Sequence, residues 1–275
     1  MTENRLRPAT AVFVAIVATT LMTLAPAAPA VAAPLPPGEL VGAEALGLLR
    51  TRTVLVAGAS GRNGRVVLRQ LVQLGIKARG MTRDAAAARA EVGDQFDWVE
   101  ADVTKPETLA AAFQGVDVVI SAVATSMPVG GNRPERVDYE GTVNLARAAK
   151  AAGVKRFVII TSSSSGQKNH FLNYIGGNVL IWKKRAEEAL MSSGLEYVIV
   201  GPAAIDDSPG GLRPIRMFPR DKYQRGMVIN RDDLATVVIT AAALPAAANR
   251  TFSVASGTAP AVADWSRSFG RMPRE

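Results

Sequence analysis

One stretch, VLVAGASGRNGRVVLRQL at residues 54–71, constrains the fold of this 275-residue chain more than any other. A continuously apolar run ends at Gly58, Gly61 and Gly64 follow at a spacing of three, and a helical pattern then begins. In such a strand–turn–helix unit, the first glycine permits a tight turn and the second lets backbone approach a pyrophosphate. The third lets helix and strand pack closely. The stretch therefore predicts the first βα unit of a dinucleotide-binding sheet.

The rest of the chain alternates strand-like and helix-like patterns. Strands are expected at 53–57, 76–82, 97–100, 116–121, 155–161 and 196–201, and helices at 63–74, 106–114, 134–152, 178–193 and 230–243. Such alternation gives right-handed βαβ units and a parallel sheet covered by helices on both faces. We therefore predict an α/β fold, a doubly wound parallel sheet of the Rossmann type, in a single domain with a small C-terminal substrate-side region.

Composition excludes several classes of function. The chain has no cysteine and a single histidine, His170, so a disulfide framework or a metal centre built on cysteine or histidine is not expected. The formal net charge of +8 is dispersed, without basic runs interleaved with aromatic residues, which argues against a nucleic-acid partner. The basic balance fits a solvated surface that helps attract an anionic ligand.

The N-terminal 33 residues differ from the remainder. Arg5 and Arg7 precede an apolar run at 11–25 and a small-residue segment in which cleavage is expected near Ala32. This order predicts a signal or targeting peptide, hence export or organelle targeting; a plastid-type leader remains open. The alternative is an uncleaved N-terminal membrane anchor, although the run is shorter than a membrane-spanning helix needs. Residues 34–50 are interpreted as a linker ending in a short helix, and 51–275 as the NAD(P)-binding domain.

Cofactor contacts are expected from the glycine turn and from the end of the second strand. The turn residues assigned to the pyrophosphate are Gly58, Ala59, Ser60, Gly61, Arg62, Asn63 and Gly64. Arg83 follows Gly64 by nineteen residues, where NAD-selective sites carry an acidic side chain. A guanidinium there suits a 2′-phosphate, so NADP(H) is favoured over NAD(H), with Arg62 as a second contact. Asp84 is the rival that would bind an unphosphorylated ribose.

Two further strand ends are expected to line the crevice. Asp102 and the adjacent Val103 follow the third strand, where they could meet the adenine amino group; the alternative for Asp102 is a turn or cap. Ala122 and Ala124 follow the fourth strand, where small side chains leave room for the middle of the cofactor.

Several blocks in order resemble the atypical short-chain dehydrogenase/reductase family, in particular its NAD(P)H-binding group with a GASGxxG turn. The blocks are DYEGTVNLARAAKAAGVKRFVIITSSSSG, GNVLIWKKRAEEALMSSGLEYVIVGP and INRDDLATVVITAA, and the likeness covers roughly residues 52–257. The resemblance implies that Lys183 touches the cofactor ribose and that a serine after the fifth strand, Ser162 or Ser163, takes part in proton transfer. It also implies that residues 206–228, which are rich in Arg and Lys, form the substrate-binding part. Their basic bias suggests an anionic substrate or a solvated loop.

The chain departs from the family pattern at the catalytic tyrosine. Standard members carry tyrosine four residues before the lysine, whereas Val179 stands there in this chain, and none of its tyrosines has lysine four residues on. His170 and Tyr174 lie between the serine loop and Lys183, and either could supply a proton. Two functions follow as hypotheses. The first is an NADP-dependent oxidoreductase that acts on a small carbonyl or alkene compound, and the second is a non-catalytic NADP(H)-binding sensor or assembly protein.

Overall fold

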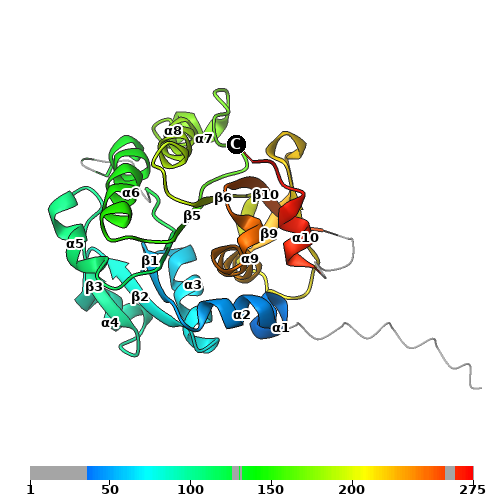
Figure 1. Ribbon diagram of the computed structural model, residues 1–275. Coiled ribbons are helices and arrows are strands. Elements are labelled where there is room, and N and C mark those ends of the chain that lie inside the picture. The colour runs from blue at the N-terminus through cyan, green and yellow to red at the C-terminus, as the bar shows by residue number, and fades with distance from the viewer. Residues whose placement is uncertain (1–35, 126–129, 131, 258–263, 275) are drawn as a thin grey trace, which may run out of the picture. The chain divides into compact units, whose positions relative to one another are not determined.

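The computed structural model describes residues 36–125, 130, 132–257 and 264–274, so the leader predicted over 1–33 lies outside the described residues (Figure 1). An eight-stranded sheet has the order β3-β2-β1-β4-β5-β6-β10-β8, and within the described residues only β8 runs antiparallel to its neighbour. The expected doubly wound parallel α/β fold is confirmed. The strands are β1 (Thr53–Ala57), β2 (Lys77–Thr82), β3 (Asp97–Glu100), β4 (Val118–Ser121), β5 (Arg156–Ile160), β6 (Tyr197–Pro202), β8 (Ile215–Phe218) and β10 (Arg250–Ser256), with β7 (Ala204–Asp206) and β9 (Val228–Asn230) forming a separate parallel pair.

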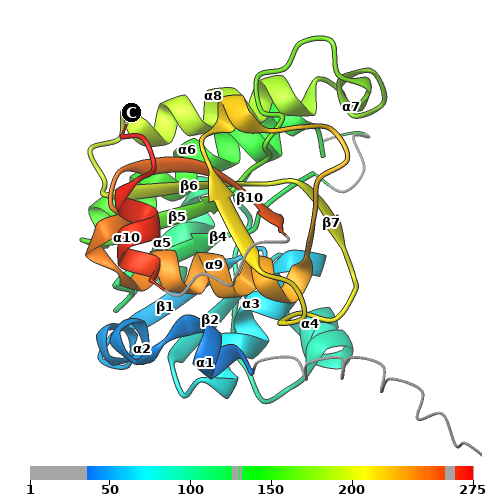
Figure 2. The same ribbon diagram turned by 90° about the vertical axis from the view of Figure 1, so that its right-hand side faces the viewer.

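Helices cover both faces of the sheet. The α-helices are α1 (Pro37–Val41), α2 (Ala43–Leu49), α3 (Arg62–Gln73), α4 (Ala85–Val92), α5 (Leu109–Ala112), α6 (Gly141–Ala151), α7 (Phe171–Ile175), α8 (Val179–Met191), α9 (Arg231–Ala243) and α10 (Trp265–Gly270). Short 3₁₀ turns occupy Pro106–Thr108, Arg220–Lys222 and Pro245–Ala247, and a π-helical turn occupies Glu135–Glu140. Helices α3 and α9 lie on one face, and α5, α6 and α8 lie on the other (Figures 1 and 2).

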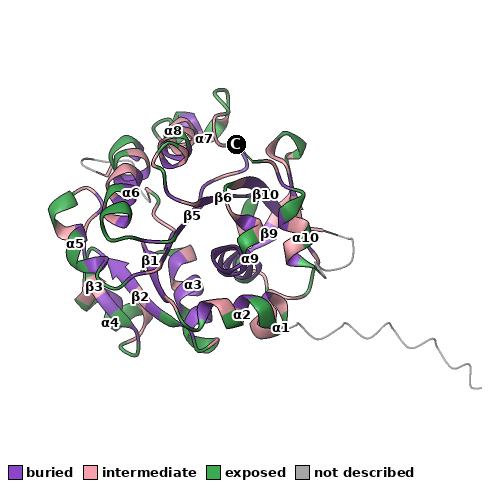
Figure 3. Cartoon of the chain, in the orientation of Figure 1, coloured by how far each residue is buried: buried purple, intermediate pink, exposed green. Residues whose placement is uncertain are grey.

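The two layers of helices explain why the strands are apolar at every position. In β1, Val54 and Val56 join the core cluster on the α3 and α9 side, whereas Leu55 and Ala57 join the cluster on the opposite side. Successive strand residues point to opposite faces, so a strand buried on both faces needs apolar side chains at every position. All of β1 is buried as a result (Figure 3).

The stretch interpreted as a linker folds as α1 and α2, whose Val41, Ala45 and Leu49 are buried against α9. Trp265 of α10 donates its indole N–H to the Leu40 carbonyl, 2.7 Å away, so a distant part of the chain also closes on α1. Helix α9 is buried nearly all around as a consequence (Figure 3). Residues 36–50 therefore contribute to the core of the folded unit.

Two expected helices have a different local form. The helix expected at 106–114 is a 3₁₀ turn followed by the single turn of α5, ended by Gly115 in the left-handed region. The helix expected at 134–152 begins as the π-helical turn Glu135–Glu140 before α6. Such wider turns occur frequently at functional sites, and this one carries Asp138.

Candidate functional site

The phosphate turn joins β1 to α3 and is shaped by its three glycines. Gly58 has φ of +75°, and a Cβ there would stand 3.1 Å from the Val123 backbone nitrogen. At Gly64, a Cβ would overlap the Gly58 carbonyl oxygen and lie 2.8 Å from Ala59 Cα. Gly61 is the N-cap of α3, and no side chain caps the helix, so its first N–H groups point at the turn without a side-chain acceptor. The turn has the geometry of an anion site.

A cavity of about 450 Å³ opens beside this turn, at the carboxyl ends of β1, β2 and β4 and beside the residues that follow β3. The predicted cofactor residues that line it are Gly58, Ser60, Gly61, Arg83, Asp102, Val103, Ala122 and Ala124. The predicted residues outside its lining are Ala59, Arg62, Asn63, Gly64 and Lys183. Residues from four different strand ends therefore meet at one crevice, as expected for an open parallel sheet.

Arg83 and Asp84 have different environments at the end of β2. The Asp84 carboxylate accepts a hydrogen bond from Ala87 N, 2.8 Å away, and is the N-cap of α4, a helix the sequence reasoning did not anticipate. Arg83 is exposed at the cavity and makes no hydrogen bond or ion pair with the described residues. Asp84 is therefore engaged in the fold, while the Arg83 guanidinium is available to a ligand.

Asp102 belongs to a local turn as well as to the cavity wall. Its Oδ1 accepts hydrogen bonds from Thr104 N and Thr104 Oγ1, both at 2.9 Å. Asp102 therefore has the turn role that the sequence analysis gave as its alternative. Its second carboxylate oxygen remains for a further donor.

The most buried charged contact beside the crevice is the ion pair of Lys183 and Asp138. Lys183 Nζ on α8 lies 2.6 Å from Asp138 Oδ1, with side chains 13% and 2% exposed. The other carboxylate oxygen accepts from Thr125 N at 3.1 Å and from Thr125 Oγ1 at 2.6 Å. Because Thr125 directly follows Ala124, which lines the crevice, Lys183 is fixed next to the crevice. Sequence reasoning missed Asp138, although an acidic residue on the helix after the fourth strand was a signal.

The other predicted catalytic side chains are not joined to Lys183. Ser163 is buried, and its hydroxyl donates to the Gly201 carbonyl at 2.7 Å. Tyr174 is 79% exposed on α7. His170 Nδ1 accepts from Leu172 N at 3.3 Å and caps α7. No hydrogen bond between these three residues and Lys183 occurs within the described part of the chain.

The phosphate turn is tied to the segment after β7 by Asp207. Arg62 Nη2 donates to Asp207 Oδ2 at 2.5 Å, and Arg231 Nε donates to Asp207 Oδ1 at 2.8 Å. Arg231 also donates to Asn63 Oδ1. The hydrogen bond from Arg231, together with Arg62, holds the pKa of the Asp207 carboxyl below its ordinary value. Residues of the expected substrate-side region thus reach the first turn of α3.

A second ion pair anchors that region to α8. Arg220 donates to both oxygens of the fully buried Glu187, at 2.8 and 2.9 Å, and to Thr161 Oγ1 at 3.0 Å. Lys222 pairs with Asp221 at 3.0 Å. Two basic residues of 206–228, Arg220 and Lys222, therefore pair with carboxylates of the protein itself.

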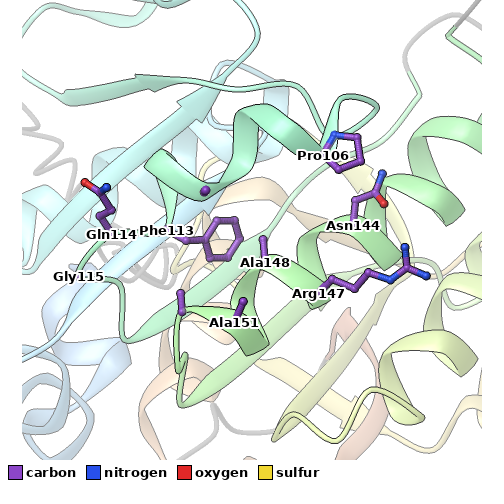
Figure 4. Close-up of a pocket in the computed structure, with 10 residues that line it drawn as sticks. Pro106, Phe113, Gln114, Gly115, Asn144, Arg147, Ala148 and Ala151 are labelled. Carbon is purple, nitrogen blue, oxygen red and sulfur yellow. The ribbon is translucent and has the colours of Figure 1, made fainter.

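A larger cavity, of about 530 Å³, lies between α5 and α6 (Figure 4). Phe113 and four alanines make up half of the residues that line it, and Arg147 supplies its charge. Asn144 also lines it, while donating to the Val103 carbonyl at 2.9 Å. We place the candidate site at the strand ends because the glycine turn and the free Arg83 guanidinium line that cavity and the buried Lys183 lies beside it.

Within the residues that the structure describes, no three His, Cys, Asp or Glu side chains gather in a way that could hold a metal ion. No helix there has the length and hydropathy to cross a membrane.

Comparison with known proteins gives concordant results. A model of the NAD(P)H-binding family matches residues 58–245. An uncharacterized chloroplastic protein of Arabidopsis thaliana is 31% identical over 80% of this chain and 75% of its own length. Sanguinarine reductase of Eschscholzia californica is 29% identical over 80% of this chain and 96% of its own length. A solved Bacillus halodurans structure, classed among NAD-dependent epimerase/dehydratases, has 25% identity and a TM-score of 0.66, covering 76% of this chain and 96% of its own.

Proposed function

Since the chain belongs to the NAD(P)H-binding family of atypical short-chain dehydrogenase/reductases, we propose that it is an NADP(H)-dependent oxidoreductase acting on a small carbonyl or alkene compound. A nicotinamide dinucleotide is the ligand class of this family. The observation that carries the enzymatic proposal is the buried pair of Lys183 on α8 and Asp138 in the π-helical turn, beside the crevice. A lysine whose direction is fixed by a carboxylate can bind a ribose hydroxyl and stabilise negative charge on a reacting oxygen.

The groups at the crevice fit the pyrophosphate, the 2′-phosphate and the nicotinamide ribose of the cofactor. The uncapped first turn of α3 would hold the pyrophosphate through backbone N–H groups. Arg83 would hold the 2′-phosphate of NADP(H), because its guanidinium is unpaired at the cavity while Asp84 is occupied as a helix cap. Lys183, which uses one ammonium proton on Asp138, has two N–H groups left for the nicotinamide ribose. The bound nicotinamide would supply the hydride.

The protein's part in the reaction would then be to orient the cofactor and to place positive charge beside the reacting oxygen. Lys183 Nζ can stabilise negative charge that develops on that oxygen. The balancing proton would come from water or from an exposed donor such as Tyr174, because Ser163 donates its proton to the Gly201 carbonyl. Ser163 is therefore proposed to shape the loop after β5, with Ser162 as the serine nearer to solvent.

Replacement of Lys183 by alanine tests this function, with its neighbour as a matched control. Lys184 lies on the same helix, where its ammonium is 3.7 Å from the exposed Glu188. We expect Lys183→Ala to lower kcat/KM by at least about 100-fold for transfer of deuteride from labelled NADPH to a carbonyl panel. Lys184→Ala should stay within about twofold, because exposed pairs contribute little. Equal losses in the two variants would remove Lys183 from the mechanism.

The second candidate function is a non-catalytic NADP(H) sensor or assembly protein. The observation in its favour is the absence of a tyrosine four residues before Lys183, together with the exposure of Tyr174. Calorimetric binding of NADPH with no deuteride transfer to any acceptor would establish this function and overturn the enzymatic one.

We also propose that residues 1–33 are a leader for export or organelle targeting, with cleavage near Ala32. The chloroplastic designation of the Arabidopsis relative supports an organelle. N-terminal sequencing of the protein recovered from fractionated cells should start near Ala33. A protein that starts at Met1 in the membrane fraction would instead support an uncleaved anchor.

A further inference from the structure

Three basic side chains line the crevice without a partner in the described part of the protein. Arg83 follows β2, Lys105 follows β3, and Arg136 lies in the π-helical turn before α6. All three are exposed, and within the described residues none of their side chains makes a hydrogen bond or an ion pair. Asp102 is the one acidic residue among the described residues that line the crevice, and its Oδ1 already accepts from Thr104. The lining therefore carries an excess of positive charge, whose field a cavity concentrates toward an anion.

Two other cations beside the crevice differ, because each pairs with a carboxylate of the protein. Lys183 pairs with Asp138, and Arg62 donates to Asp207. Arg62, the second phosphate contact expected from the sequence, thus has a partner in the fold and lies outside the lining. The unpaired side chains of the lining are the cations that a phosphate can bind there without displacing a carboxylate.

Lys105 and Arg83 lie at the same end of the crevice. Strands β2 and β3 are neighbours in the sheet, and just beyond them Ala101 N donates to the Thr82 carbonyl at 2.8 Å. The segments that carry Arg83 and Lys105 therefore leave the sheet side by side. Strand β4, beside whose end the Lys183 pair lies, is three strand positions from β3, about 14 Å. Lys105 thus belongs to the ribose end assigned to Arg83.

Arg136 adjoins the residues that follow β3. A Cβ built on Gly141 would stand 2.7 Å from Val103 Cγ2 and 3.4 Å from the Arg136 carbonyl oxygen. The backbone of Arg136 therefore lies next to Val103, which precedes Lys105 by two residues. Because Arg136, Lys105 and Arg83 line one cavity, the three cations stand around the same space.

A 2′-phosphate needs more than one cation. At pH 7 a phosphomonoester carries a charge of about −1.5 to −2 and has three strong acceptor oxygens. The Arg83 guanidinium neutralises one unit of that charge and can hold two of the oxygens. The remaining charge and the third oxygen require a further cation. The pyrophosphate does not compete for it, because backbone N–H groups at the glycine turn are its proposed contacts.

We infer that Lys105 and Arg136 complete, together with Arg83, a three-cation site for the 2′-phosphate, and that both residues determine the preference of the crevice for NADP(H) over NAD(H). The inference rests on the proposed function, to whose cofactor selectivity it assigns two further residues. The Lys105 ammonium supplies a point charge with three donors, and the Arg136 guanidinium supplies a planar fork. The ribose of NAD(H) has a neutral hydroxyl in place of the phosphate and gains little from these charges.

Adenosine 2′,5′-bisphosphate and adenosine 5′-monophosphate are the probes, because they differ only in the 2′-phosphate. Isothermal titration measures the binding of both to the full chain and to its Lys105→Gln and Arg136→Gln variants. We expect each substitution to weaken binding of the bisphosphate about tenfold, as for loss of one charge-assisted contact, and binding of the monophosphate by less than about twofold. Lys105→Arg keeps the charge and should keep most of the affinity. Lys77→Gln is the matched control and should change neither affinity, since this exposed lysine lies at the amino end of β2.

The outcomes separate this inference from the proposed function. If both substitutions leave bisphosphate binding unchanged while Arg83→Ser abolishes the preference, the inference is overturned and the NADP(H) assignment stands. Equal weakening of the two nucleotides at unchanged melting temperature also overturns it, because Lys105 and Arg136 would then act on the adenosine or the 5′-phosphate. If both substitutions remove the preference but the wild type transfers no deuteride from NADPH, the inference stands and the oxidoreductase proposal fails. A wild type without any preference overturns the inference and the choice of NADP(H) together.

Discussion

The two ends of the crevice are held by different kinds of interaction. At the phosphate turn the shape comes from glycine backbone, and the Arg62 and Asp207 side chains that meet there are 71% and 63% exposed. At the other end Lys183 and Asp138 form an ion pair with exposures of 13% and 2%. A substitution at the turn is therefore expected to lower stability and cofactor affinity mainly by disturbing the backbone geometry. A substitution at the lysine end is expected to lower stability because it leaves a buried charge without its partner.

Under the proposed function, the difference follows from the groups that each end would bind. A pyrophosphate is recognised by backbone N–H groups at a helix N-terminus, which side chains would only obstruct. A ribose hydroxyl and a reacting oxygen need a directed cation, and a lysine keeps one direction only when a partner holds it. Four substitutions test this difference between the two ends.

Gly64→Ala should have the largest effect. Its Cβ would stand 2.8 Å from Ala59 Cα and overlap the Gly58 carbonyl, so α3 must move away from β1. We expect a loss of NADPH affinity of at least about 100-fold, or 2.7 kcal/mol, and a destabilisation of about 1–3 kcal/mol. Isothermal titration and urea unfolding measure the two. Gly47→Ala is the control, because nothing lies within 4 Å of its Cβ and alanine favours the helix; similar losses there would contradict the geometric explanation.

Asp138→Ala should have the second-largest effect. Removal of one member of the buried pair leaves Lys183 without its partner, which is expected to lower the free energy of unfolding by about 3 kcal/mol. Adding Lys183→Met should restore part of this stability but not NADPH affinity, as a double-mutant cycle would show. Glu188→Ala, which removes the exposed partner of Lys184, should change stability by less than about 0.5 kcal/mol. Absence of coupling between Lys183 and Asp138 would refute the contrast between buried and exposed pairs.

Arg83→Ser should act on cofactor choice alone. Loss of the guanidinium is expected to weaken NADPH binding by roughly 10- to 100-fold, the range for a charge-assisted contact, while NADH binding changes by less than about twofold. Fluorescence titration of both nucleotides measures this ratio. Arg69→Ser on the exposed surface of α3 is the control for loss of one positive charge. Equal weakening of NADPH and NADH by Arg83→Ser would withdraw the assignment of NADP(H).

The sequence was informative where one local pattern determines the structure. The apolar strands and the glycine turn predicted the sheet and the phosphate end of the crevice, because burial on both faces and tight turns are set by neighbouring residues. The sequence favoured Arg83 over Asp84 at the cofactor ribose, but it gave no structural role for Asp84. That role depends on α4, whose N-cap is Asp84, and the alanine-rich sequence of that helix gives almost no apolar periodicity.

The lysine end depends on contacts between residues far apart in the chain. Lys183 and Asp138 are separated by 45 positions, and Arg220 and Glu187 by 33. No periodicity or spacing rule links such pairs, so Asp138 and Glu187 were not identified beforehand.

Asp207→Asn should have the smallest effect on stability of the four substitutions. Its partners Arg62 and Arg231 hold the Asp207 pKa below the ordinary value, with Arg231 contributing most. A carboxyl whose pKa is lowered by folding stabilises the fold above its unfolded pKa, and this contribution is lost as pH falls through the folded pKa. Because the Asp207 side chain is well exposed, the variant should keep the wild-type melting temperature at pH 7 but exchange the amide hydrogens of 206–211 faster. Asp221→Asn, which removes another exposed carboxylate, should leave that exchange unchanged. A large fall in melting temperature for Asp207→Asn would show that the phosphate end also depends on side-chain charge.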